Sequence, residues 1–201
     1  MKVLIACEES QEVCRAFRER GHEAYSCDIQ DCSGGHPEWH LKGDVLFYLS
    51  YMKWDIFIGH PSCQFLSNAG ARWLYSGGKL NEDRYKKGLE AKAFFMELLN
   101  LNIPKIAIEN PLPSKIYELP KPTQIIQPYE YGHPYSKKTL LWLKGLPLLK
   151  PTNIINDYKT FLPSNTGGKK RGQKHRFVSI NKIDSSKTFK GIADAMADQW
   201  G

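Results

Sequence analysis

The chain has 201 residues, enough for one domain with a sizeable core, and its composition is ordinary for a globular protein, with 41% hydrophobic and 24% charged residues. No apolar run approaches the roughly 20 residues of a membrane helix, and the short apolar start runs into Cys-Glu-Glu at residues 7–9, which predicts a strand and not a signal peptide. We therefore expect a cytoplasmic protein whose five cysteines are free thiols. The net charge of +7 suits a polyanionic partner, although charge also serves solubility alone.

The N-terminal segment predicts a strand, a helix and a second strand. Residues 2–7 form a continuous apolar run, as in a strand buried on both faces. Residues 11–20 follow with apolar positions at helical spacing, and Gly21 ends this helix. A short strand over residues 23–27 ends at Asp28. This order favours a parallel sheet with a right-handed crossover.

The rest of the chain continues the alternation of strands and helices. We expect strands over residues 55–58, 105–108, 124–128 and 139–143, a long helix over 82–100 and a closing helix over 192–200. The apolar stripe of the long helix is expected at Tyr85, Leu89, Ala93, Met96 and Leu99. The pattern weakens between residues 150 and 190, but no repeat or boundary divides the chain, so residues 1–201 are predicted to form one α/β domain.

Polar and reactive side chains follow the predicted strands, where open α/β sheets bind their ligands. Asp28 can accept both hydroxyls of a ribose, or lie in a solvated turn. Cys63 is either a small packed hydrophobe or a nucleophile. Glu109 ends another strand, where a carboxylate is costly to bury without a purpose. These residues taken singly leave the alternatives open.

Four short motifs occur in one order along nearly the whole chain. They are Gly-Asp-Val at residues 43–45, Pro-Ser-Cys-Gln-Phe-Leu-Ser at 61–67, Glu-Asn-Pro at 109–111 and Tyr-Gly-His-Pro at 131–134. Together they resemble the DNA cytosine-5 methyltransferases, in particular the short versions from bacteriophages and prophages. In that family the corresponding motifs read Gly-Asp-Ile, Pro-Pro-Cys-Gln, Glu-Asn-Val and Tyr-Gly-x-Pro. The resemblance implies a Rossmann-like S-adenosylmethionine-dependent methyltransferase fold, with a mostly parallel sheet flanked by helices.

The resemblance also implies a reaction, the methylation of carbon 5 of cytosine in DNA with S-adenosylmethionine as cofactor. Cys63 is expected to add covalently to carbon 6, Glu109 to hold ring nitrogen 3, and Lys137 to support the carbonyl oxygen. Because a free thiol has a pKa of about 8.5, we expect a positive neighbourhood or a helix dipole at Cys63. Asp28 is expected at the ribose and Asp44 at the adenine. The residues expected to bind the cofactor are Ala6, Cys7, Glu8, Glu9, Ser10, Asp28, Ile29, Asp44, Val45 and Pro61.

Two motifs depart from the family pattern. Residues 5–10 read Ile-Ala-Cys-Glu-Glu-Ser where the family has Phe-Ala-Gly-x-Gly-Gly, so no glycine lets the backbone approach the ligand closely. Glu8 or Glu9 is then the expected acceptor for the cofactor's ammonium group. Where the family has Arg-x-Arg, this chain has Lys137 and Thr139. Lysine is a point donor and not a planar fork, so it constrains the carbonyl oxygen less.

Contacts with DNA are expected from two segments. A target base must leave the duplex to reach such a site, and Gln64 and Ser67 of the cysteine loop are expected at the nucleic acid. A basic cluster is expected to contact phosphates or to be only a solvated loop; it comprises Lys169, Lys170, Arg171, Lys174, His175 and Arg176. Residues 146–190 form a reduced, irregular segment where family members carry a recognition domain. Target recognition is therefore short or relaxed, or a partner protein or oligomer supplies it.

Three alternatives remain beside this interpretation. The first is methylation of a free cytosine nucleotide, which the small recognition segment favours. The second is a non-catalytic protein that binds nucleic acid or cofactor, in which Cys63 is structural. The third is a zinc site, for which the spacing of four side chains is suitable, namely Cys27, Cys32, His36 and His40. Because the neighbouring aspartates have other uses in the methyltransferase interpretation, we expect no metal.

Overall fold

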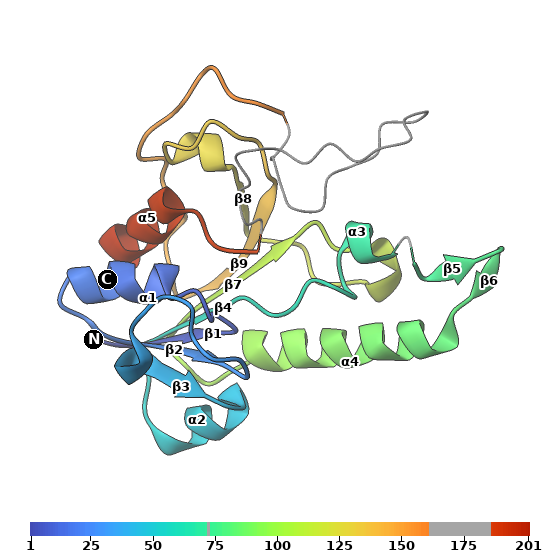
Figure 1. Ribbon diagram of the computed structural model, residues 1–201, viewed down its shortest axis with the longest axis horizontal. Helices are drawn as coiled ribbons and strands as arrows, with labels where there is room; N and C mark the ends of the chain where they lie inside the picture. Colours follow the sequence, from blue (N-terminus) through green and yellow to red (C-terminus); the bar gives the residue numbers. More distant parts are fainter. Residues whose placement is uncertain (72, 161–185) are drawn as a thin grey trace.

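The computed structural model describes residues 1–71, 73–160 and 186–201, and a seven-stranded sheet forms its centre (Figure 1). The strands follow the spatial order β3-β2-β1-β4-β7-β9-β8. Their bounds are β1 Lys2–Ala6, β2 Glu23–Asp28, β3 His40–Lys42, β4 Ile56–Gly59, β7 Lys105–Pro111, β8 Gln124–Ile126 and β9 Thr139–Lys144. The first five in this order are mutually parallel, whereas β9 is antiparallel to both of its neighbours.

Helices cover both faces of the sheet (Figure 1). These helices are α1 (Glu12–Glu19), α2 (Val45–Tyr51), α4 (Glu82–Leu99) and α5 (Lys190–Trp200). Short 3-10 helices lie at Pro37–Trp39, Lys115–Tyr117 and Pro128–Glu130. The predicted fold class, a Rossmann-like and mostly parallel sheet flanked by helices, is confirmed.

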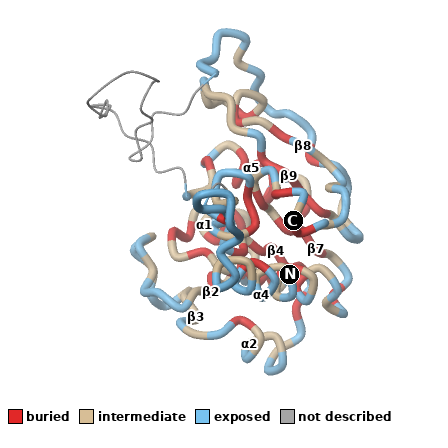
Figure 2. Tube along the Cα trace, turned by 90° about the vertical axis from the view of Figure 1, so that its right-hand side faces the viewer, coloured by how far each residue is buried: buried red, intermediate tan, exposed pale blue. Residues whose placement is uncertain are grey.

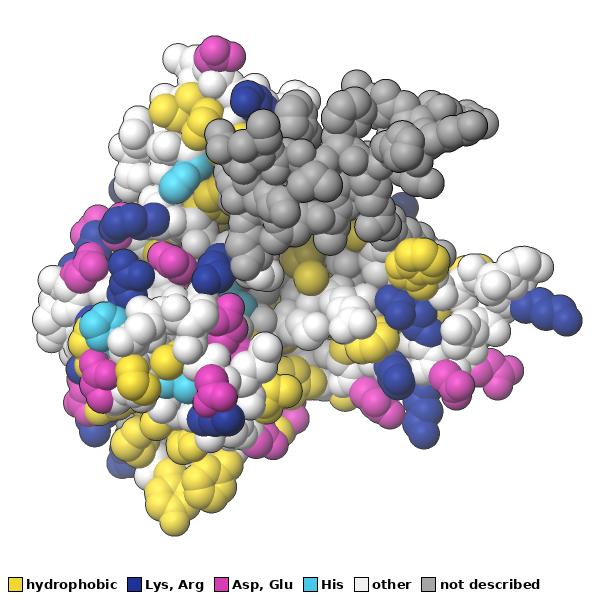
Figure 3. Space-filling model, in the orientation of Figure 1, with side chains coloured by type: hydrophobic (Ala, Val, Ile, Leu, Met, Phe, Trp, Pro, Cys, Tyr) yellow, Lys and Arg dark blue, Asp and Glu magenta, His cyan; other side chains and the backbone are white. Residues whose placement is uncertain are grey.

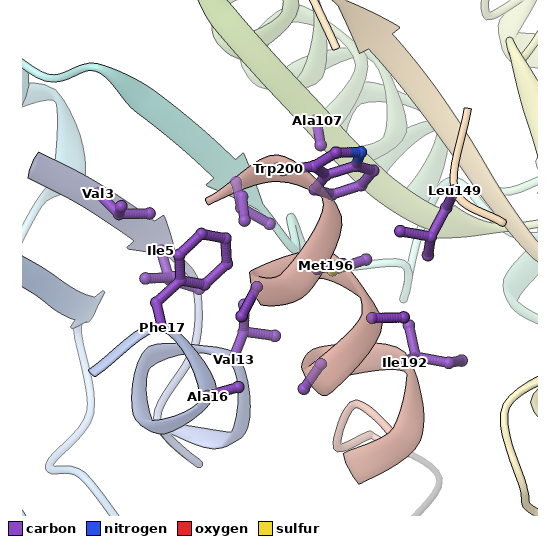
Figure 4. Packing of buried hydrophobic residues seen from close by; sticks show 14 of the residues in the cluster. Val3, Ile5, Val13, Ala16, Phe17, Ala107, Leu149, Ile192, Met196 and Trp200 are labelled. Atoms are coloured by element: carbon purple, nitrogen blue, oxygen red, sulfur yellow. The ribbon is translucent and has the colours of Figure 1, made fainter. Parts of the chain in front are cut away.

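The central strands are buried on both faces, as their continuous apolar runs predict. In β1, Val3 and Ile5 point to the face covered by α1 and α5, whereas Leu4 and Ala6 point to the face covered by α2 and α4. Figure 2 shows the buried strands running through the middle of the molecule. Figure 4 shows the first of these two cores, where Trp200 of α5 packs beside the sheet.

The buried face of α4 agrees only in part with the predicted one: Tyr85, Met96 and Leu99 of the expected stripe pack against the core. The residues expected to form its apolar stripe include Leu89, which is 42% exposed, whereas Gly88, Phe95 and Leu98 are the buried ones. A Cβ at Gly88 would overlap the ring of the fully buried Tyr117. The absence of a side chain there lets the helix approach that ring closely.

Most predicted elements are confirmed with shifts of one to three residues at their ends. The sequence interpretation missed β3 and α2, which are short, and did not foresee that β9 lies between β7 and β8. It also missed α3 (Asn68–Ala71) and the hairpin of β5 (Tyr75–Ser76) and β6 (Lys79–Leu80), which projects from the body beyond the end of α4 (Figure 1).

The surface carries both signs of charge. Figure 3 shows basic and acidic side chains interspersed on the face that it presents, with hydrophobic side chains gathered over α2. The exposed aromatic residues of that helix are Phe47 and Tyr51. Among the described residues, no helix is both long enough and apolar enough to span a membrane.

Candidate functional site

The register of the parallel strands brings four chain segments into one row. Ala6 pairs with Cys27 on one side and with Gly59 on the other, and Gly59 pairs with Ile108. The residues that come next in each strand therefore lie side by side at the carboxyl edge of the sheet. They are Cys7, Asp28, His60 and Glu109. This edge is where the predicted chemistry is expected.

A cavity of about 440 Å³ opens above this row of residues. Cys63 and Glu109, the expected nucleophile and the expected contact to ring nitrogen 3, both line it. Lys137 lines it as well, because β9 begins beside the last residue of β7, with Thr139 opposite Pro111. The antiparallel insertion of β9 therefore delivers the third predicted catalytic residue to the cavity.

Glu109 forms a buried pair with His60. The His60 Nδ1 lies 3.4 Å from Glu109 Oε2, and the two side chains are only 11% and 18% exposed. Burial by itself raises the pKa of Glu109, but the hydrogen bond and charge of His60, together with Lys137, lower it below its usual value. Conversely, burial lowers the pKa of His60, while Glu109 and the charge of Glu8 raise it above its usual value. The pair therefore favours an ionised carboxylate and a protonated imidazole.

Cys63 is exposed at the same cavity. The pKa of its thiol is raised, by partial desolvation and by the charge of Glu109, while Lys137 acts in the opposite direction. The expected positive neighbourhood is therefore only partly present, since Lys137 provides it but the Glu109 carboxylate outweighs it. The resting form of Cys63 is the thiol.

The other cysteines are less suited to nucleophilic chemistry. Burial raises the pKa of Cys7, Cys14 and Cys27 to about 12 each, so their thiols stay protonated. Cys32 is half-buried and lines neither this cavity nor the neighbouring one. Cys63 thus differs from the other four in its exposure, and of those four only Cys7 also lines the first cavity.

Backbone and side-chain hydrogen bonds hold the cysteine loop against the end of β7. Asn110, the second residue of the Glu-Asn motif, donates from Nδ2 to the carbonyl oxygen of Pro61 at 2.9 Å. Further along, the Ser114 amide donates to the Leu66 carbonyl at 2.7 Å. Asn110 was not a predicted site residue, and its bond explains how the two motifs are held together.

The glycine-free first motif uses a strained backbone and an internal cap. Cys7 adopts a left-handed conformation with φ of 58°, a region in which glycine carries no penalty. Both oxygens of Glu8 accept amide hydrogens of α1, from Val13 at 2.7 Å and Cys14 at 3.1 Å. Glu8 therefore serves the helix, which leaves Glu9 as the better candidate for a ligand's ammonium group.

A second cavity, of about 490 Å³, adjoins the first and shares part of its wall. The shared residues are Cys7, Asp28, Gln30, Pro61 and Ser62. The predicted Ile29, Asp44 and Val45 line the second cavity, and the cysteine loop adds Gln64. Ala91 and Phe94 of α4 complete the apolar side, and the sequence interpretation missed both because they lie outside the apolar stripe that it expected.

Two aspartates of the second cavity also have local backbone roles. Asp28 accepts the amide of Gln30 at 2.9 Å, which shapes the turn after β2. Asp44 is the N-cap of α2 and accepts the Leu46 amide at 2.9 Å. These bonds hold both carboxylates at the cavity.

Most of the other predicted site residues also lie at the two cavities. Glu9 and Ser10 line the first, whereas Ala6 and Ser67 line neither: Ala6 is fully buried in the core, and the Ser67 Oγ accepts the Gly70 amide at 3.2 Å. The predicted phosphate contacts lie outside the described residues; they are Lys169, Lys170, Arg171, Lys174 and Arg176.

The zinc alternative lacks a matching geometry. No cluster of three or more potential ligands occurs in the described ranges, although all four candidate ligands belong to them. His36 stacks on Trp39 with ring centroids 3.8 Å apart. The two nitrogens of His40 lie 2.9 Å from Ser26 Oγ and 2.9 Å from the Gln30 carbonyl oxygen.

Comparisons with known proteins give matches only among solved structures. No protein-family model and no curated protein sequence matches the chain. The chain is similar to the methyltransferase EhMeth of Entamoeba histolytica, with 17% identical residues and a TM-score of 0.48 over 85% of this chain and 60% of that one. It is also similar to an rRNA methylase from Escherichia coli, with 17% identity and a TM-score of 0.38 over 71% of this chain and 55% of that one. The chain thus spans less than two thirds of the length of either structure.

Proposed function

We propose that this protein is an S-adenosylmethionine-dependent methyltransferase that methylates carbon 5 of cytosine in DNA, with Cys63 as the covalent nucleophile. One observation carries the proposal. An exposed cysteine, a buried glutamate and a lysine from three distant segments line one cavity, and that cavity shares a wall with a second one containing two aspartates. This arrangement is what a reaction between a bound base and a separately bound cofactor requires.

The second cavity fits an adenosyl group. Asp28 would accept the ribose hydroxyls, and Asp44 would accept the exocyclic amine of the adenine, whose flat faces suit the apolar Ile29 and Phe94. The wall shared with the first cavity would bring the methionine end toward Cys63, with Glu9 near its ammonium group. When bound, S-adenosylmethionine supplies an electrophilic methyl group.

The first cavity supplies the groups that activate a cytosine. The Cys63 thiolate forms a bond to carbon 6, and the displaced electron pair makes carbon 5 nucleophilic enough to take up a methyl group. Charge that builds on ring nitrogen 3 is neutralised through Glu109, and Lys137 supports the carbonyl oxygen. Carbon 5 then loses its proton to solvent water, and the electron pair of that C–H bond forms the double bond to carbon 6 as the bond between sulfur and carbon 6 breaks, which restores the ring and the thiolate.

A trapped covalent adduct tests this proposal. If fluorine replaces hydrogen at carbon 5, the methylated adduct has no proton to lose and the protein stays attached to the DNA. We expect DNA containing 5-fluorocytosine, with S-adenosylmethionine, to give a complex that survives denaturing electrophoresis. Cys63→Ser should abolish it, because a serine hydroxyl ionises far less readily than a thiol.

Cys32→Ser is the matched control, since Cys32 is half-buried and lies outside both cavities. It should leave the adduct intact, whereas Cys14→Ser would disturb a fully buried core position. If the Cys63→Ser protein still forms the adduct, or methylates cytosine at the normal rate, the covalent mechanism is wrong.

The substrate form is tested in the same assay. We expect methylation of cytosine in DNA, and a free cytosine nucleotide in excess should compete poorly, because phosphate contacts outside the base contribute to binding. If the free nucleotide is methylated rapidly and DNA is not methylated, the proposal that DNA is the substrate is wrong, but the proposed covalent mechanism stands. Loss of methylation on both substrates would favour a protein that only binds.

A further inference from the structure

His60 is the charged neighbour of Glu109, and the sequence motifs assign it no role. His60 directly follows β4, and Glu109 is the neighbouring residue on β7. The two lie side by side because Gly59 and Ile108, which precede them, pair in the sheet. The distance of 3.4 Å between Nδ1 and Oε2 is long for a hydrogen bond, yet both groups are buried beside the cavity that contains Cys63.

Among the described residues, the side chain of His60 has one hydrogen-bond partner, Glu109. Its Nε2 is buried and has no hydrogen-bond partner among the described residues, so Glu109 is the side chain that orients the ring. Buried polar side-chain atoms usually have a hydrogen-bond partner, so the unpaired Nε2 beside the cavity needs an explanation. An ionisable ring held only by the carboxylate that faces the cavity indicates a role in the chemistry.

The charged groups around His60 come from every neighbouring segment. Glu109 is on β7, Glu8 follows β1, and Lys137 precedes β9. The two carboxylates favour the imidazolium, while Lys137 and burial oppose it. Both carboxylates line the cavity, but Glu8 is tied to two amides of α1, whereas Glu109 has His60 as its hydrogen-bond partner. Glu109 is therefore the group with which His60 can exchange a proton at the site.

We propose that His60 is a positioning residue that stores the proton which Glu109 delivers to ring nitrogen 3 of the substrate cytosine. This inference rests on the proposed function. In the resting site the proton is on His60 and Glu109 is a carboxylate. As Cys63 sulfur bonds to carbon 6, one proton leaves His60 Nδ1 for Glu109, and the carboxyl group gives a proton to nitrogen 3.

The proton balance closes over the cycle. Before addition the site holds the Cys63 thiolate, and the pair of His60 imidazolium and Glu109 carboxylate carries no net charge. After addition the cytosine adduct is neutral, and the pair of His60 imidazole and Glu109 carboxylate carries one negative charge. When the sulfur leaves carbon 6, nitrogen 3 returns its proton through Glu109 to His60. The thiol proton of Cys63 goes to solvent before addition, and the proton of carbon 5 goes to solvent water after methyl transfer, so no further reactant is needed.

The shared proton can be measured without any substrate. Nitrogen-15 NMR of the full chain follows the imidazole nitrogens of its six histidines, and His60→Asn assigns the His60 signals. We expect His60 to titrate above the usual histidine value of about 6.5. In Glu109→Gln its pKa should fall, because the neutral amide no longer stabilises the imidazolium. A pKa at or below the usual value in the unmodified protein would overturn the proposal.

The second measurement is the pH dependence of methyl transfer in a single turnover on cytosine-containing DNA. The proposed reaction needs Cys63 deprotonated and His60 protonated, so the rate should follow a bell-shaped profile against pH. We expect one limb of this profile at the pKa that NMR assigns to His60. In His60→Asn that limb should be replaced by one at lower pH, and the rate at neutral pH should fall about 100-fold. Asparagine can donate a hydrogen bond to Glu109 but cannot carry the proton.

His22→Asn is the control, since His22 lies in the turn before β2, at the opposite edge of the sheet. It should change neither the limb nor the rate. A His60→Asn protein that is slower with an unshifted profile would reduce His60 to a structural role and overturn the proposal. If the unmodified protein methylates no cytosine substrate, the proposed function fails and the delivery step with it, whereas a raised pKa would still support the shared proton.

Discussion

The two cavities differ in the side chains that line them. The first holds most of the ionisable groups that interact with one another, namely Glu8, His60, Cys63, Glu109 and Lys137. The second combines two aspartates with apolar walls from α2, α4 and the turn after β2. The side chains of the first cavity can therefore transfer protons and form a covalent bond. Those of the second can hold a ligand that has both hydrogen-bonding groups and a flat aromatic ring.

The origin of the two cavities differs as well. Most side chains of the first lie at or just beyond the ends of β1, β2, β4 and β7, or just before β9, so the register of the sheet brings them together. The second depends on loops and on the way α4 packs against Tyr117. We therefore expect substitutions in the first cavity to change rates and substitutions in the second to change cofactor affinity.

The largest effect is expected from Glu109→Gln. Glutamine keeps the size of the side chain, but it can neither deliver a proton to ring nitrogen 3 nor neutralise the charge that builds there. Methyl transfer should slow by about 100- to 1,000-fold, the usual cost of losing one group that stabilises transition-state charge. Cofactor affinity measured by calorimetry should stay within about twofold. A loss of affinity as large as the loss of rate would mean that the two cavities do not separate chemistry from binding.

A smaller effect is expected from Asp44→Asn. Asparagine is as good an N-cap as aspartate, so α2 keeps its hydrogen bond from Leu46 and the melting temperature should barely change. The amide no longer offers a carboxylate to the adenine, and cofactor affinity should fall about tenfold, or about 1.4 kcal/mol. The rate at saturating cofactor should be unchanged, and Asp83→Asn, in the first turn of α4, is the control. Unchanged affinity in Asp44→Asn would remove adenine recognition from this residue.

The smallest effect concerns Cys7 in the shared wall. Its left-handed backbone is easy for glycine and costly for a β-branched residue. Cys7→Gly should change the free energy of unfolding by less than about 1 kcal/mol, and Cys7→Val should lower it by about 1–3 kcal/mol. Chemical denaturation measures both. Equal destabilisation by the two substitutions would show that packing of the thiol, and not the backbone conformation, sets the requirement at this position.

The sequence predicted the central strands, the main helices and the cysteine loop because these features are local. Residues 2–6 are apolar without interruption, and such a run is decided by burial on both faces of a parallel sheet. The motif around Cys63 likewise identified the nucleophile candidate from its neighbours alone. Roles that depend on several segments were harder to predict, and the assignment of Glu8 to a ligand is an example, since its carboxylate serves the amides of α1.

The sequence by itself determined the alternation of strands and helices and the set of reactive side chains at the strand ends, because hydrophobic periodicity and turn residues are written along the chain. Only the tertiary structure decided which of these side chains meet. His60 and Glu109 are 49 positions apart, and they form a pair because β4 and β7 align in register. Lys137 lines the same cavity because β9 inserts antiparallel beside β7, and Gly88 lets α4 pack closely on the ring of Tyr117. Register and close packing arise between segments distant in the chain, so no local pattern specifies them.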